Sequence, residues 1–209
     1  LAPLASLSDV AAEHDTWLMT DDAHGIGVVG GGRGSDFVNG GANGSGGRVP
    51  LQMGTLSKAI GAYGGYLCAS KPVIDLIRPR CRTLIYSTAL PPGTVAAAIA
   101  ALDLIRDDPE YAALPLKKAK DFTAMLGLAD AESPIVPIVL GDSERTLLAS
   151  RLLEDEGFLV VSIRPPTVPD GKARLRVTFT AAHKDEDIAR LAEIIRTQIL
   201  EAADAEASA

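Results

Sequence analysis

One lysine stands in a sequence setting that suits chemistry better than it suits a helix. Lys58 lies within GTLSKAIGAYGG (residues 54–65), among glycines, hydroxyl groups and small side chains. Glycine residues let the backbone adopt positive φ angles and approach a ligand closely. A lysine amine held there, away from bulk water, is a nucleophile for a carbonyl carbon. The segment therefore predicts a reactive-site loop, and an ordinary surface lysine on a glycine-rich loop is the alternative.

An acid and an imidazole form a second candidate group upstream of this lysine. Asp21 and His24 belong to DDAHG (residues 21–25), which directly follows the apolar run Trp17–Met19. Carboxylates are seldom buried without a partner, so an Asp-X-X-His pair at a strand end is a poor core filler. A lysine that forms a Schiff base and an aspartate that keeps a pyridinium nitrogen protonated meet the needs of pyridoxal 5'-phosphate (PLP). These residues predict a PLP site; the alternative is an aspartate that caps the following turn beside a half-exposed histidine.

The composition is that of a soluble globular protein, with 209 residues, 47% of them hydrophobic and 22% charged. The formal net charge is −7 and the basic residues form no cluster, which argues against a nucleic-acid or anionic-membrane partner. Cys68 and Cys81 match no metal-ligand spacing, so we expect reduced thiols, no metal site and a cytoplasmic location. Because the chain begins at Leu1 and at once enters a helical pattern, we expect it to lack the N-terminal part of a longer protein.

The elements that must position these groups alternate between helical and strand patterns. Such alternation is typical of an α/β fold with a mostly parallel sheet. The glycine-rich segment 25–47 predicts a long mobile loop, or a pair of loops around a short element, with a disordered insertion as the alternative. We expect helices at 2–13, 72–80, 91–106, 111–128, 144–156 and 185–203, and buried strands or strand candidates at 16–20, 49–53, 66–69, 82–86, 135–140, 159–163 and 174–179.

The pattern changes near residue 105. Residues 1–105 alternate helix and strand around the lysine loop, whereas residues 106–209 place two late strands, on either side of a proline-rich loop, among helices. We therefore predict an α/β part over 1–105 and a smaller α+β domain over 106–209.

Four segments together resemble the α-oxoamine synthase family, in family order and over nearly the whole chain. They are DDAHG (21–25), GTLSK (54–58), LIYST (84–88) with the following Pro91-Pro92, and RPPTVP (164–169) with ARLRVT (173–178). The resemblance implies the fold of the type I PLP enzymes, the aspartate aminotransferase fold. In that fold, residues 1–105 would be the C-terminal part of the PLP-binding large domain and 106–209 the small C-terminal domain, so that the chain corresponds to the later part of a family subunit.

The same resemblance implies roles for the residues around the cofactor. Lys58 would form the Schiff base, Asp21 would pair with the pyridinium nitrogen and His24 would bond the phenolic oxygen. Thr55 would bind the phosphate, with a turn-stabilising hydroxyl as the alternative, and Ser57 would be a weaker contact. Thr88 would lie near the phosphate of the partner subunit in a homodimer with shared active sites. From the residues alone, Ser87 and Thr88 also fit an N-terminal cap before the helix at Pro91.

The substrate contacts implied by the resemblance lie in the second part of the chain. Arg176 would bind the amino-acid carboxylate, for which a guanidinium fork is well suited. Thr167 and Arg164 would contact the acyl substrate. Because side chains alternate along a strand, Arg174 and Arg176 share a face, so a solvated basic face is the alternative.

The reaction implied by the family is the joining of an amino acid to an acyl thioester with loss of carbon dioxide. The Arg164–Pro169 loop resembles the branch that condenses L-alanine with pimeloyl-CoA, or a pimeloyl carrier protein, in biotin biosynthesis. Other branches, such as 5-aminolevulinate synthase, 2-amino-3-ketobutyrate CoA ligase and serine palmitoyltransferase, share the lysine and aspartate motifs. A non-catalytic partner subunit or an inactive fragment is the alternative from another class.

Overall fold

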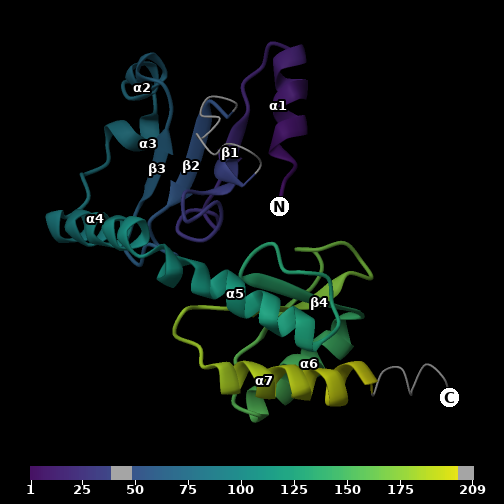
Figure 1. Cartoon of the computed structure of the whole chain (residues 1–209). Helices are drawn as coiled ribbons and strands as arrows, with labels where there is room; N and C mark the ends of the chain where they lie inside the picture. Colours follow the sequence, from purple (N-terminus) through teal and green to yellow (C-terminus); the bar gives the residue numbers. More distant parts are fainter. Residues whose placement is uncertain (39–48, 202–209) are drawn as a thin grey trace. The chain divides into compact units, whose positions relative to one another are not determined.

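The computed structural model describes residues 1–38 and 49–201 of the chain (Figure 1). The chain divides into two compact units, Leu1–Ala113 and Leu114–Ala209. The division falls within helix α5 (Pro109–Met125), whereas the boundary predicted near residue 105 falls in the last turn of helix α4 (Pro92–Asp107). The assignment of the two parts to the domains of a family subunit remains a prediction.

The first unit is built around a three-stranded mixed sheet in the order β1-β2-β3. The strands are β1 (Met19–Asp21), β2 (Leu51–Thr55) and β3 (Gly65–Cys68). Strands β1 and β2 are parallel, with Asp21 opposite Met53, whereas β2 and β3 are antiparallel. Because parallel neighbours end at the same edge, the acidic motif after β1 and the lysine loop after β2 leave the sheet at the same end.

The helices of the first unit are α1 (Leu4–Glu13), α2 (Lys71–Ile77), α3 (Arg82–Ile85) and α4 (Pro92–Asp107). The prediction of a strand over 82–86 is wrong. The backbone N–H groups of Leu84 and Ile85 both donate to the carbonyl of Cys81, at 2.9 and 3.0 Å, which closes a short helix instead. The segment RTLIY (82–86) fits a strand and a helical turn equally well, because it is too short to reveal a period.

Strand β1 is shorter and more exposed than the buried strand predicted over 16–20. It begins only at Met19, and Trp17 and Met19 keep 63% and 58% of their surface exposed, while Thr20 is buried. Among the described strands, β1 has a neighbour on one side only. The apolar pattern identified the strand correctly, but the burial of a strand depends on what packs against it.

The glycine-rich segment is compact where the structure describes it. Residues 25–38 contain a 3-10 helix (Ser35–Phe37) and an isolated antiparallel bridge between Ile26 and Arg33. The expectation of loops around a short element is therefore confirmed for this part, while residues 39–47 of the predicted loop lie outside the described residues. The buried Val29 anchors this compact part.

The second unit packs helices α5, α6 (Ser143–Asp155) and α7 (Asp185–Ile194) against an antiparallel sheet (Figure 1). The sheet order is β4-β6-β5, with β4 (Ile135–Gly141), β6 (Ala173–Thr178) and β5 (Val161–Ile163). Strand β4 alternates strictly, so that Val136, Ile138 and Leu140 enter the core. The core side chains with no exposed surface include Phe122, Leu153, Leu175 and Ile195.

Local signals explain the ends of the helices in this unit. The Asp142 carboxylate accepts the backbone N–H of Arg145 at 2.7 Å and caps α6, as expected for an N-terminal aspartate. Gly157 follows this helix with a positive φ of 87°. Helix α7 continues into a π-helical segment (Ile195–Leu200); residues 202 and 203 of the predicted helix lie outside the described residues. No helix in the described part of the chain is long and apolar enough to cross a membrane.

Candidate functional site

Asp21 is the last residue of β1, and its carboxylate is exposed at the end of the sheet. Its Oδ1 accepts the backbone N–H of Ala23 at 3.0 Å, which is the turn-capping contact of the alternative interpretation. The neighbouring Asp22 N–H donates to the Met53 carbonyl at 2.7 Å, so this turn stays attached to β2. His24 follows on the turn and is exposed. A capping bond through one oxygen is compatible with a ligand contact through the other.

The lysine loop is organised by the Thr55 hydroxyl. Thr55 Oγ1 lies 3.0 Å from the Gly64 carbonyl, to which it donates, and 2.7 Å from Ser57 Oγ. It also accepts the backbone N–H of Ser57 at 3.2 Å. Gly61 and Gly64 have positive φ angles of 66° and 125°, as the glycine pattern predicts for a tight loop. The turn-stabilising alternative for Thr55 is therefore a real contact of this structure.

Lys58 is exposed on this loop. Its carbonyl accepts the N–H of Gly61 at 3.0 Å, which fixes the backbone on which the side chain stands. The expectation of a lysine held away from bulk water is not met by the described residues. Removal of water from Lys58 would need a covering group beyond those described.

The groups at this end of the sheet fit the chemistry of PLP. The turn after β1 supplies a carboxylate and an imidazole, and the loop after β2 supplies an amine and two hydroxyls that lie 2.7 Å apart. An amine suits the cofactor's carbonyl, a carboxylate suits its ring nitrogen and paired hydroxyls suit its phosphate. All of these residues belong to the first unit.

The capping alternative for Ser87 and Thr88 is wrong. Helix α4 begins after Pro91 and has no side-chain hydrogen bond at its N-terminal cap. The Ser87 hydroxyl instead donates back to the Thr83 carbonyl in α3, and Thr88 is exposed. The predicted contact of Thr88 with the phosphate of a partner subunit stays a prediction.

The predicted substrate residues lie in the second unit. Arg174 and Arg176 share the face of β6 that points away from the core, as predicted from strand alternation, while Leu175 is buried. Arg164 and Thr167 are exposed on the loop after β5, where the Thr167 N–H donates to the Arg164 carbonyl at 3.0 Å. An exposed basic face remains open as the alternative to carboxylate binding.

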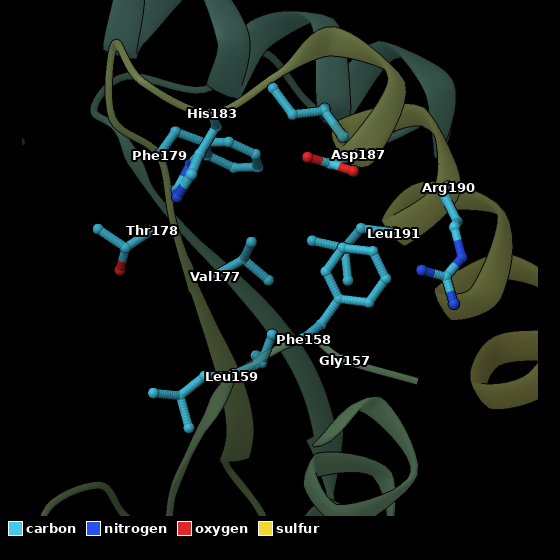
Figure 2. Close-up of a pocket in the computed structure, with 12 residues that line it drawn as sticks. Gly157, Phe158, Leu159, Val177, Thr178, Phe179, His183, Asp187, Arg190 and Leu191 are labelled. Carbon is cyan, nitrogen blue, oxygen red and sulfur yellow. The ribbon is translucent and has the colours of Figure 1, made fainter. Parts of the chain in front are cut away.

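The second unit also contains a cavity of about 370 Å³ between the start of α7 and the end of β6 (Figure 2). Phe158, Phe179 and Asp187 contribute to its wall, and Val177 enters it from the sheet. No predicted site residue lines it. Because side chains alternate along β6, Arg176 projects from the opposite face to Val177. The cavity is therefore separate from the predicted substrate contacts.

Sequence reasoning missed the part played by Asp22. The Asp22 Oδ2 accepts the backbone N–H of Ser35 at 2.9 Å and so fastens the compact loop to the end of β1. The available signal was the glycine at position 25 beside a second aspartate. The carboxylate of Asp22 occupies the space that a side chain at Gly25 would need.

Comparisons with known proteins identify the family of the chain. The family profile "Aminotransferase class I and II" matches residues 1–195. A protein of Parvibaculum lavamentivorans, provisionally named 8-amino-7-oxononanoate synthase, is 65% identical over 98% of this chain and 52% of its own length. The 8-amino-7-oxononanoate synthase of Methylocella silvestris is 62% identical over 93% of this chain and 54% of its own length.

A solved structure supports the fold. Serine palmitoyltransferase from S. paucimobilis with bound PLP–myriocin aldimine is 27% identical and has a TM-score of 0.82, over 94% of this chain and 50% of that chain. The chain belongs to the aminotransferase class I and II family. It spans about half the length of the curated relatives that it matches.

Proposed function

We propose that this chain is part of a PLP-dependent acyltransferase of biotin biosynthesis. The reaction is the decarboxylative condensation of L-alanine with pimeloyl-CoA, or a pimeloyl carrier protein, to 8-amino-7-oxononanoate, carbon dioxide and coenzyme A. The observation that carries the proposal is the parallel pair β1–β2, which directs the Asp21 turn and the Lys58 loop to one end of the sheet. The names of the relatives at 65% and 62% identity favour this branch of the family.

The cofactor would be held by residues of the first unit. PLP supplies the electron sink that stabilises negative charge at the amino-acid Cα. Lys58 Nζ would bond to the carbonyl carbon of PLP, and Asp21 would pair with the ring nitrogen. His24 would bond the phenolic oxygen, and the Thr55 and Ser57 hydroxyls would bind the phosphate.

The remaining assignments concern the substrates and the partner. Lys58 Nζ, when released, would take the α-proton of L-alanine, for which an unprotonated amine is needed. Arg176 would bind the alanine carboxylate through its guanidinium fork. Arg164 and Thr167 would contact the pimeloyl thioester. A homodimer, in which Thr88 of one subunit approaches the phosphate in the other, and a cytoplasmic location complete the proposal.

The length of the chain limits what it can do alone. Strands β1 and β3 each have one neighbour among the described strands, and Lys58 is exposed. We infer that the chain is inactive unless the part of the family length that it does not span is supplied. Open strand edges of this kind favour pairing with further chain.

Complementation tests the proposal. The chain is co-expressed with the part of the Parvibaculum relative that it does not cover, and PLP is then fixed with borohydride and mapped. We expect the label on Lys58, no label in Lys58→Arg, and full labelling in Lys120→Arg, a matched exposed lysine. L-Alanine with a pimeloyl thioester should give product faster than glycine or serine with other thioesters. Absence of label from Lys58 would refute the enzyme assignment, and a preference for glycine or serine would refute the branch.

A further inference from the structure

The carboxylate of Asp22 occupies the space that side chains at Gly25 and Gly34 would need. A Cβ atom added at Gly25 would lie 1.9 Å from Asp22 Oδ1, and one added at Gly34 would lie 2.1 Å from Asp22 Oδ2. The same Oδ2 accepts the Ser35 N–H at 2.9 Å. Any larger residue at position 25 or 34 would therefore displace the carboxylate. Gly34 also has a positive φ of 103°, which disfavours other residues there.

Tyr66, on strand β3, likewise occupies the space that a side chain at Gly54 would need. It lies opposite Gly54 in the β2–β3 pair, and a Cβ atom at Gly54 would lie 2.4 Å from the phenolic oxygen. The ring thus lies across the β2 backbone directly before Thr55. The Asp22 N–H reaches the same stretch of β2, since it donates to the Met53 carbonyl at 2.7 Å.

The charge of Asp22 also affects the pKa of Tyr66. The pKa of the Tyr66 phenol is raised above its ordinary value of 10.0, first by burial and then by the charges of Asp22 and Cys68. Such a rise is expected when a carboxylate faces a phenol, because ionisation of the phenol would bring two negative charges together. Asp22 and Tyr66 each adjoin the β2 segment Met53–Gly54, Asp22 through its backbone N–H and Tyr66 through its ring.

We propose that Asp22 and Tyr66 are positioning residues that hold the Asp21–His24 turn and the Thr55 end of β2 in one fixed arrangement. Asp22 is bonded to the compact loop through Ser35 and to β2 through its backbone. Tyr66 covers the residue that precedes Thr55. The effect of Asp22 on PLP binding rests on the proposed function, whereas the positioning itself does not.

Two substitutions at Asp22 separate its charge from its hydrogen bond. Asp22→Asn removes the charge and keeps an oxygen for the Ser35 N–H, whereas Asp22→Ala removes both. Asp130→Asn is the matched control, because Asp130 is an exposed aspartate in the second unit. The tyrosinate absorbance of Tyr66 is titrated in the 209-residue chain after the other tyrosines, Tyr63, Tyr86 and Tyr111, are changed to phenylalanine.

Both Asp22 variants should lower the pKa of Tyr66, and Asp130→Asn should leave it unchanged. Hydrogen exchange of the Ser35 amide should become about fivefold faster in Asp22→Ala and stay near its original rate in Asp22→Asn, since a net hydrogen bond is worth about 1 kcal/mol. An unchanged Tyr66 pKa in Asp22→Asn, or a protected Ser35 amide in Asp22→Ala, would overturn the proposal.

The complemented protein adds a readout that depends on PLP. Borohydride labelling of Lys58 should fall in Asp22→Ala and be restored in Asp22→Asn, because the conservative variant keeps the loop in place. Equal labelling in all Asp22 variants would contradict a positioning role. If the parent protein takes no label, the proposed function fails, but the titration and the hydrogen exchange still decide whether Asp22 and Tyr66 act as proposed.

Discussion

Replacement of Gly54 by alanine should destabilise the first unit strongly, although it adds only one methyl group. The new Cβ would lie 2.4 Å from Tyr66 Oη and 2.5 Å from its Cζ, whereas ordinary contact begins near 3.4 Å. The ring or the β2 backbone must then shift by about 1 Å, which is an overpacking cost of about 1–3 kcal/mol. Since about 1.4 kcal/mol is a factor of ten, the folding equilibrium should fall by about fivefold to 150-fold.

The assay is urea denaturation followed by circular dichroism and by the fluorescence of Trp17, the single tryptophan, which lies in the first unit. Gly93→Ala is the matched control, because nothing lies within 4 Å of a Cβ there and Gly93 is in helix α4. That variant should be stabilised by about 0.4–1 kcal/mol. In a Tyr66→Ala background the cost of Gly54→Ala should largely disappear, since the clashing ring is gone. Equal effects of Gly54→Ala in both backgrounds would refute the reasoning.

Three further predictions follow from single contacts. The raised pKa of Tyr66 means that its contribution to stability is present below pH 10.0 and is lost as pH rises through the folded-state pKa, so Tyr66→Phe should flatten the alkaline fall in urea midpoint. Leu153→Ala should cost about 2–5 kcal/mol in denaturation experiments because that side chain has no exposed surface, whereas Leu148→Ala on the same helix, 58% exposed, should change little. Thr55→Val should reduce borohydride labelling of the complemented protein, and Thr55→Ser should retain it, because serine keeps the hydroxyl that contacts Gly64; equal labelling of the two variants would count against phosphate binding.

Much of the fold around the lysine could be predicted from local patterns. The strands on either side of the lysine loop are found where apolar runs and glycines placed them, at Leu51–Thr55 and Gly65–Cys68. Helix α6 begins after Asp142 and ends before Gly157, both of which are signals carried by single residues. These predictions succeed because caps, glycine conformations and side-chain alternation are properties of a few adjacent residues.

Other features depend on partners that no local pattern reveals. The predicted strand 82–86 is instead a short helix in which the N–H groups of Leu84 and Ile85 donate to the Cys81 carbonyl, a choice that five residues do not specify. Met19 is exposed on the same strand as the buried Thr20, because the burial of a strand residue depends on what packs against its face and not on its own hydrophobicity. The observed position of the Asp22 carboxylate requires that both Gly25 and Gly34 lack a side chain. Gly34 lies on a loop whose path is not encoded in the DDAHG motif.

The two units stabilise themselves in different ways, and this difference bears on where chemistry is possible. Every large side chain with essentially no exposed surface in the described chain, such as Phe122 and Leu175, lies in the second unit. The first unit carries the predicted PLP residues. It is held together instead by polar contacts such as that of Asp22 with Ser35, and by side chains packed against glycines, such as Tyr66 against Gly54. A unit with so thin an apolar core gains little from hydrophobic burial, at about 25 cal/mol per Å². We infer that the remaining length of the family, about half of each relative, supplies the burial that would turn the exposed Lys58 into a reactive amine.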